Sequence, residues 1–201
     1  MKQTYFSNKT NLSQVLGIKP IILLLISILF GGINLNAQKY ITKEGHIEIF
    51  SKTPLFTIEA VNKKVASIVD FTNGDLVATT LVRSFKFHEA LVEDHFNENY
   101  MESEKFPKAS FKGKVTNIKD IDLKKNGEYK ITFKGTLTMH GETNPLDGAG
   151  TIIIKDGKVT GKAQFTVSLA AYKIRVEESY KKSINDEIRL DINFDYALVT
   201  N

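Results

Sequence analysis

The chain contains no cysteine. This absence excludes disulfide bridges, thiolate zinc sites, a cysteine nucleophile and a lipid-modified N-terminal cysteine. The sequence also has no glycine-rich phosphate loop, no G-x-S-x-G motif and no H-E-x-x-H motif, which are short signatures of several large enzyme classes. Sequence motifs therefore give no support to catalysis, and we expect the protein not to be an enzyme.

The charge of the chain is nearly balanced once its first 37 residues are set aside. That segment carries three lysines and no acidic residue, so 24 basic residues face 23 acidic ones in the remainder. The lysines are spread along the sequence, without the clustered basic patch that marks a nucleic-acid-binding surface. We therefore expect no nucleic-acid partner.

Residues 1–37 have the pattern of a secretory signal peptide. Lys2, Lys9 and Lys19 precede the apolar run PIILLLISILFGGI, which is shorter than the ~20 apolar residues that span a bilayer. Small and polar residues follow, with Ala37 at the expected cleavage point. We expect residues 38–201 to form a single periplasmic or secreted domain with no stable membrane insertion after cleavage. A retained membrane anchor is the alternative.

The rest of the sequence is dominated by alternating apolar and polar residues, which is typical of β-strands with one buried face. The alternation is clear in residues 109–118, 129–140, 162–169 and 187–198, and weaker in residues 45–50, 62–71 and 76–87. Asn73-Gly74, Asn126-Gly127 and Asp156-Gly157 separate such runs and favour tight hairpin turns. A further turn is expected where Gly141 and Pro145 interrupt the pattern.

Sequential strands that are apolar on one face must hide that face. An antiparallel meander does so by closing into a barrel, whereas a sandwich usually needs long crossover connections. The sequence therefore predicts an all-β fold, an antiparallel meander closed into a barrel of about eight strands. One or two short helices are expected: residues 88–101, in which Val92, Phe96 and Tyr100 form an apolar stripe, and residues 170–187, which are less regular.

Two charged groups of side chains near this helix invite a chemical interpretation. His88 and His95 lie two helical turns apart, but a helical zinc pair usually has a spacing of four residues and a third ligand. Glu98, Glu102 and Glu104 are near neighbours in sequence, which seldom face each other across a cleft as glycosidase carboxylates do. We interpret both groups as surface or supporting side chains, and expect no metal site, no cofactor and no catalytic residue.

The order of the motifs resembles that of a known family. A strand ending in RSFKF is followed by the short helix, by Phe106-Pro107 with Phe111, and by GTLTMHGETNPL. The last segment matches the pattern L-T-x-x-G-x-T-x-P through Leu137, Thr138, Gly141, Thr143 and Pro145. Together these motifs resemble the YceI-like family of exported polyisoprenoid-binding proteins, and the resemblance covers nearly all of residues 38–201.

The resemblance implies a lipocalin-like barrel with its short helices at the barrel opening and a long apolar pocket. Its partner would be an isoprenoid or fatty-acid-like lipid, held as an amphiphilic chain. The expected pocket lining is Phe85, Phe87, Phe96, Tyr100, Phe111, Ile131, Phe133, Leu137, Met139, Phe165, Val167 and Phe194. The alternative is a filled barrel that serves as an interaction or structural module of the cell envelope and holds no small ligand.

Overall fold

The computed structural model describes residues 38–52, 57–178, 182 and 184–200. The segment expected to be a signal peptide, residues 1–37, lies outside the described residues. Within the described part of the chain, no helix is long and apolar enough to cross a membrane.

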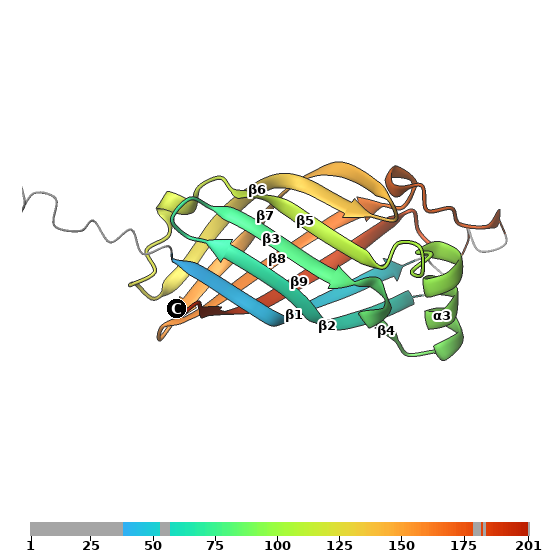
Figure 1. Cartoon of the computed structure of the whole chain (residues 1–201), viewed down its shortest axis with the longest axis horizontal. Helices are drawn as coiled ribbons and strands as arrows, with labels where there is room; N and C mark the ends of the chain where they lie inside the picture. Colours follow the sequence, from blue (N-terminus) through green and yellow to red (C-terminus); the bar gives the residue numbers. More distant parts are fainter. Residues whose placement is uncertain (1–37, 53–56, 179–181, 183, 201) are drawn as a thin grey trace, which may run out of the picture. The chain divides into compact units, whose positions relative to one another are not determined.

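In the described part of the chain, nine strands follow one another (Figure 1). They are β1 (Lys39–Lys52), β2 (Thr57–Asp70), β3 (Asp75–Leu81), β4 (Lys86–Phe87), β5 (Lys108–Val115), β6 (Gly127–Met139), β7 (Glu142–Lys155), β8 (Lys158–Ser168) and β9 (Glu187–Leu198). The helical elements are η1 (Val82–Ser84), α3 (Ala90–His95), η2 (Phe96–Tyr100), η3 (Ile118–Asp120) and η4 (Ala170–Tyr172). The element η2 is a single π-helical turn that continues α3 directly.

Eight of the strands close into an antiparallel barrel. Each long strand pairs with its neighbours in sequence, and β1 pairs with both β2 and β9, which completes the cylinder. The two-residue strand β4 is an addition that pairs with β2 through Ala60 and Val61. The prediction of an all-β meander closed into a lipocalin-like barrel of about eight strands, with a short helix at one end, is thus confirmed.

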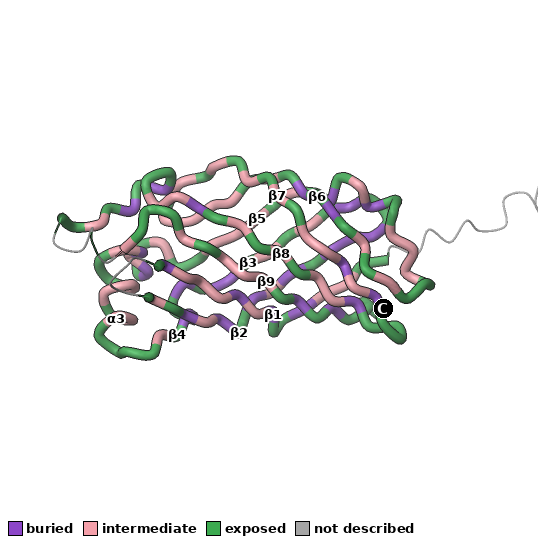
Figure 2. The backbone as a smooth tube through the Cα atoms, turned by 180° about the vertical axis from the view of Figure 1, so that it is seen from behind, coloured by how far each residue is buried: buried purple, intermediate pink, exposed green. Residues whose placement is uncertain are grey.

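The alternation in the sequence becomes an alternation of burial (Figure 2). In β6, Ile131 and Phe133 are buried, whereas Lys130, Thr132 and Lys134 are exposed. Successive side chains of a strand point to opposite faces, so the apolar set of each strand points into the barrel. The same rule holds for β9, whose bounds coincide with the run predicted from the sequence.

Two of the four predicted turns are tight two-residue hairpins. Asp156 and Gly157 have φ values of 51° and 77°, and His140 and Gly141 have values of 50° and 78°, as hairpin turns of this kind require. At the Asn73-Gly74 turn only Gly74 has a positive φ, of 83°.

The turn predicted at Gly141 and Pro145 is right only at Gly141, and the prediction of a tight hairpin at Asn126-Gly127 was wrong. Pro145 does not interrupt the ladder but lies within β7, opposite Thr136 of β6. Pairing of β7 with β8 begins only at Gly150, so this part of β7 resembles an edge strand, where proline is tolerated. Asn126-Gly127 does not form a tight hairpin either, because β5 and β6 are joined by residues 116–126, a longer connection that includes η3.

That connection plugs one end of the barrel. Ile118 is buried, and Ile121 and Leu123 pack against the same core cluster. The Tyr129 hydroxyl holds the connection in place, because its single hydrogen is shared between the carbonyl oxygens of Asp122 and Lys125, each at 3.1 Å. An apolar connection packed on a core gains more than an exposed tight turn, which explains why the dipeptide signal failed here.

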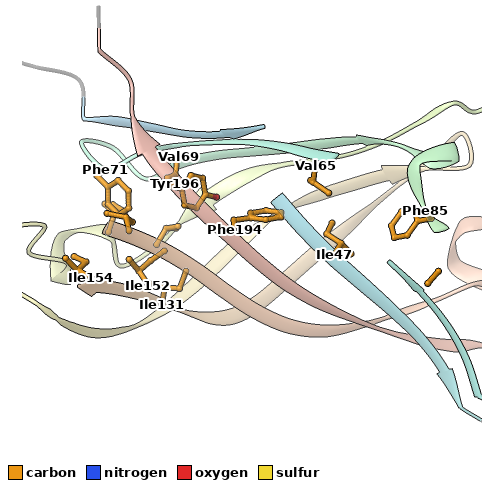
Figure 3. Close-up of a cluster of buried hydrophobic side chains, with 14 residues drawn as sticks. Ile47, Val65, Val69, Phe71, Phe85, Ile131, Ile152, Ile154, Phe194 and Tyr196 are labelled. Carbon is orange, nitrogen blue, oxygen red and sulfur yellow. The ribbon is translucent and has the colours of Figure 1, made fainter. Parts of the chain in front are cut away.

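We call this end of the barrel the plugged end and the opposite end, which carries α3 and η4, the helix end. Buried residues at the plugged end include Val69, Phe71, Val115, Ile152, Ile154 and Val159. Figure 3 shows Phe71, Ile154, Ile152 and Tyr196 gathered on one side of the view, with Phe85 on the other and Val65 between them. A second, smaller cluster at the helix end contains Val82, Met101, Val167, Tyr172 and Ile174.

Candidate ligand-binding cavity

A cavity of about 350 Å³ lies inside the barrel. All eight strands of the cylinder contribute to its lining, together with Val92 of α3 and Phe96 of η2. This volume falls within the ~300–1,000 Å³ typical of small-molecule sites. The cavity follows from the fold, since a barrel of eight strands has an interior wide enough for one small ligand.

The lining is almost entirely aliphatic and aromatic. Among the described residues, no aspartate or glutamate lines the cavity. Lys162 contributes from an exposed, outward-facing position of β8, and His95 and Tyr100 contribute at the helix end. A cavity with this lining offers an apolar chain a favourable transfer from water and offers a charged group almost no partner.

All twelve residues expected from the sequence to line a pocket do line this cavity: Phe85, Phe87, Phe96, Tyr100, Phe111, Ile131, Phe133, Leu137, Met139, Phe165, Val167 and Phe194. That these side chains contact a lipid stays a prediction. Sequence reasoning missed Ile188, Leu190, Ile192 and Tyr196, which share the inward face of β9. The alternation in β9 contained the signal for them. The alternation of residues 162–169 likewise contained the signal for Leu169. Met101 and Ile174 lie in or beside irregular segments, where no periodic signal exists.

The interior is hollow rather than filled toward the helix end. Leu137, Phe165 and Leu190 face inward, yet their side chains are only partly buried. At the plugged end, by contrast, the inward-facing residues Val69 and Ile154 are 1% and 2% exposed. An inward apolar side chain that retains accessible surface borders empty space, so packing is complete at one end only.

Aromatic rings line the wall in two groups. Phe133 meets Phe111 and Phe165 edge to face, with centroid distances of 5.7 and 6.1 Å. At the helix end, Phe96 meets Phe85 at 5.9 Å and Phe87 at 4.8 Å. Such contacts fix the orientations of the rings. Phe96 packs against Phe87 of β4 and against Phe85, and so attaches the helical segment to the barrel wall.

The carboxylate of Glu93 anchors α3 to β4. It pairs with the Lys86 ammonium and accepts a hydrogen bond from the Phe87 backbone N–H at 3.2 Å. The hydrogen bond from Lys86, followed by that from Phe87, holds the pKa of Glu93 below its ordinary value of 4.5 against the opposing effect of burial. The ionised form of Glu93 therefore contributes to the position of the helix.

The His140 ring connects three segments at the helix end. Its Nδ1 atom lies 2.9 Å from the Tyr172 carbonyl oxygen, and because a carbonyl only accepts, Nδ1 carries the hydrogen. Its Nε2 atom lies 3.5 Å from a carboxylate oxygen of Glu102. The ring also packs edge to face on Phe106 at 4.9 Å. The β6–β7 turn thereby fixes both η4 and the segment that leads into β5.

A buried hydroxyl pair lies deep in the barrel. Ser67 donates to the Val77 carbonyl oxygen at 2.9 Å, so the Tyr196 hydroxyl donates to Ser67 Oγ, at 2.8 Å. Burial raises the pKa of Tyr196 to about 12, and the hydrogen bond with Ser67 opposes this only in part. Both hydroxyls are satisfied within the wall, which leaves the deep part of the cavity apolar.

The histidines and glutamates considered as metal ligands or catalytic groups do not come together in one site. His88 precedes α3 and is 96% exposed beside Glu89, whereas His95 lines the cavity. Glu98 is exposed, Glu102 pairs with Lys105 at 3.3 Å, and Glu104 pairs with Arg83 at 3.0 Å. Among the described residues, no group of three or more histidine, aspartate or glutamate side chains is arranged to hold a metal ion.

Three solved structures share this architecture. A polyisoprenoid-binding domain from Saccharophagus degradans, implicated in plant cell wall breakdown, has a TM-score of 0.70 at 11% identity and covers 82% of this chain and 100% of its own. BcnA of Burkholderia cenocepacia has a TM-score of 0.63 at 19% identity, with coverage of 76% and 96%. A Campylobacter jejuni YCEI protein has a TM-score of 0.52 at 18% identity, with coverage of 70% and 84%.

None of the curated proteins compared with this chain matches it. The model of the YceI-like domain, however, matches residues 37–196. That match spans every strand of the barrel except the last two residues of β9. The chain belongs to the YceI-like family.

Proposed function

We propose that the protein is an exported carrier that holds an isoprenoid or other amphiphilic lipid chain in the barrel cavity. The observation that carries this proposal is the cavity itself, which is hollow, apolar and free of carboxylates in its described lining. The polyisoprenoid-binding domain of similar fold supports the same chemistry. The family match and the lack of catalytic motifs support a binding protein rather than an enzyme.

The polarity of the lining suggests how the ligand is oriented. Among the described residues that line the cavity, His95 and Tyr100 are the polar side chains outside the barrel strands, and both lie at the helix end. The head group would lie near these two residues, and the hydrocarbon chain would extend toward Phe194 and Ile152. Each methylene removed from water contributes ~0.8 kcal/mol, so a long chain is held tightly without a polar motif.

Export and a periplasmic or secreted location remain part of the proposal. They rest on the basic and apolar pattern of residues 1–37 and on membership of the YceI-like family. Release of the chain from the membrane after cleavage is expected on the same grounds.

The alternative, a filled barrel that acts only as an interaction module, accords less well with the partly buried inward residues Leu137, Phe165 and Leu190. A solid core would leave these side chains as buried as Val69 and Ile154.

Equilibrium binding of geranylgeraniol and of palmitate to the delipidated protein tests the proposal. Leu137→Gln places an amide in the cavity, where the apolar lining leaves it without partners, and should weaken binding by about tenfold or more. Thr136→Gln, at the adjacent exposed position of β6, is the matched control and should bind as the parent does. Equal affinities for the two variants would argue against a site inside the barrel.

A further inference from the structure

The outer end of the Phe133 ring lies against Gly148 on the neighbouring strand. The two residues are cross-strand partners between β6 and β7. A Cβ atom added to Gly148 would lie 2.4 Å from Cζ of Phe133, and 2.9 and 3.1 Å from its two Cε atoms. The ring therefore occupies the space that any side chain at position 148 would fill.

The rings of Phe194 and Phe111 also lie over glycines. A Cβ on Gly45 would meet the Phe194 ring at 2.6 Å, and a Cβ on Gly113 or Gly135 would meet the Phe111 ring at 2.7 Å. Each ring thus lies along the wall, over a glycine, instead of projecting across the interior. This arrangement explains how a barrel with so many inward aromatic residues still contains a cavity of about 350 Å³.

Gly148 differs from these other glycines in what surrounds it. A side chain at Gly113 or Gly135 would also approach a backbone carbonyl oxygen at 2.3 or 2.4 Å, which would disrupt the strand pairing itself. At Gly148 the three nearest atoms all belong to the Phe133 ring, and the glycine does not have a positive φ. Alanine therefore suits the backbone at position 148 and would act by displacing the ring.

The cavity extends on both sides of Phe133. Leu137 and Met139 line it toward the helix end, and Ile131 and Ile152 line it toward the plugged end. With β7 behind it, a displaced ring can move only into the interior. We propose that Gly148 is a specificity-determining residue: because it has no side chain, the Phe133 ring can lie against the wall, and the deep half of the cavity stays open. Chain length is then the property of the ligand that Gly148 controls.

This inference rests on the proposed function, because it assumes that a lipid chain enters the cavity. Its test is the dependence of affinity on chain length, measured by native mass spectrometry of the delipidated full chain with geraniol, farnesol, geranylgeraniol and solanesol. In the parent protein each buried methylene should tighten binding about fourfold, until the chain reaches the plugged end. In Gly148→Ala the affinity should stop rising at a shorter alcohol, so that geranylgeraniol binds at least about tenfold more weakly than to the parent while geraniol binds equally.

Two further variants complete the test. Gly148→Ala combined with Phe133→Leu removes the ring that the alanine displaces, and should restore the rising length profile. Gly127→Ala is the control glycine, because its Cβ would approach only Tyr129, at 3.6 Å or more, and its profile should match that of the parent. Thermal unfolding of each variant reports whether the barrel is intact.

Phe133→Trp adds ring bulk at the same place with Gly148 unchanged, and should also shorten the profile. It gives a second measurement if Gly148→Ala does not fold. Parent-like length profiles for both Gly148→Ala and Phe133→Trp would overturn the inference while leaving the carrier proposal intact. A parent protein that binds none of the alcohols would overturn both.

Discussion

His140 donates a hydrogen bond from Nδ1 to the carbonyl oxygen of Tyr172 across 2.9 Å, and so joins the β6–β7 turn to η4. The donor ring is nearly enclosed, with a side-chain exposure of 9%, and Tyr172 is buried. A buried hydrogen bond of this kind contributes about 1 kcal/mol net, and more when one partner is left unsatisfied.

His140→Ala should therefore lower the free energy of unfolding by about 1–2 kcal/mol, as measured by urea denaturation. His140→Asn loses the same contact with Tyr172, but asparagine tolerates the positive φ of 50° at this position better than alanine. The asparagine variant should be the more stable of the two. If the two variants were as stable as the parent, the connection to η4 would not contribute to stability.

Tyr196 and Ser67 give the barrel a specific sensitivity to alkaline pH. Burial raises the pKa of Tyr196 from 10.0 to about 12 in the folded protein. The unfolded chain releases this proton first, so the contribution to stability is complete below pH 10.0 and is lost as the pH rises toward about 12.

Tyr196→Phe should cost about 1 kcal/mol at neutral pH, because Ser67 loses a donor. It should also remove part of the decline in stability at alkaline pH, an effect that amounts to about 2–3 kcal/mol for a pKa shift of this size. Denaturation curves at a series of pH values measure both effects. Parallel stability profiles for parent and variant would show that Tyr196 titrates alike in the folded and unfolded states.

Glu93 makes the attachment of α3 sensitive to acid. Its pKa in the folded protein lies below the ordinary value of 4.5, chiefly because of the hydrogen bond from Lys86. A lowered pKa means that the contribution is present above the ordinary value and is lost as the pH falls through the folded value.

Glu93→Gln should accelerate hydrogen exchange of the α3 amides at neutral pH, since the charged contact with Lys86 is gone. Well below pH 4.5 the parent should lose the same contact, so the difference between parent and variant should shrink. A difference that persists unchanged in acid would assign the effect to packing of the side chain rather than to its charge.

Phe96 and Glu98 test which face of the short helical segment matters for binding. Phe96 lines the cavity and contacts Phe85 and Phe87, whereas Glu98 is exposed. Phe96→Ala should release a bound lipid about tenfold faster than the parent does, because it loses apolar contact area and the ring contacts that position the helix.

Tyr100→Ala should act in the same direction, because this residue also lines the cavity. Glu98→Gln should leave the rate of release unchanged, and serves as the control from the same turn of the helix. Stopped-flow measurement of the release of a fluorescent fatty acid separates these outcomes. Faster release from Glu98→Gln alone would show that a polar side chain of this segment, rather than its rings, retains the lipid.

The sequence predicted the strands well because their signal is local. Each run of alternating residues carries its own apolar face, so the bounds of β9 and the inward direction of Ile131 and Phe133 follow without knowledge of the neighbours. The stripe of Val92, Phe96 and Tyr100 likewise identified the cavity-facing side of the helical segment, even though its last five residues form a π turn.

The features that the sequence did not predict depend on contacts between distant segments. The apolar connection that contains Ile118 replaced an expected hairpin because the barrel end offered it a core to pack on. The position of the Phe194 ring along the wall depends on its contact with Gly45, between β9 and β1. This contact is fixed by the register of β9 against β1, which local alternation does not specify between strands far apart in sequence.

Native mass spectrometry of the purified full chain tests whether the barrel holds a lipid. We expect a complex with one equivalent of an isoprenoid or fatty-acid-like lipid, which is lost on delipidation and replaced by one equivalent of added geranylgeraniol. A protein that shows only the mass of the ligand-free chain, both as purified and after incubation with geranylgeraniol, would contradict the proposed carrier function.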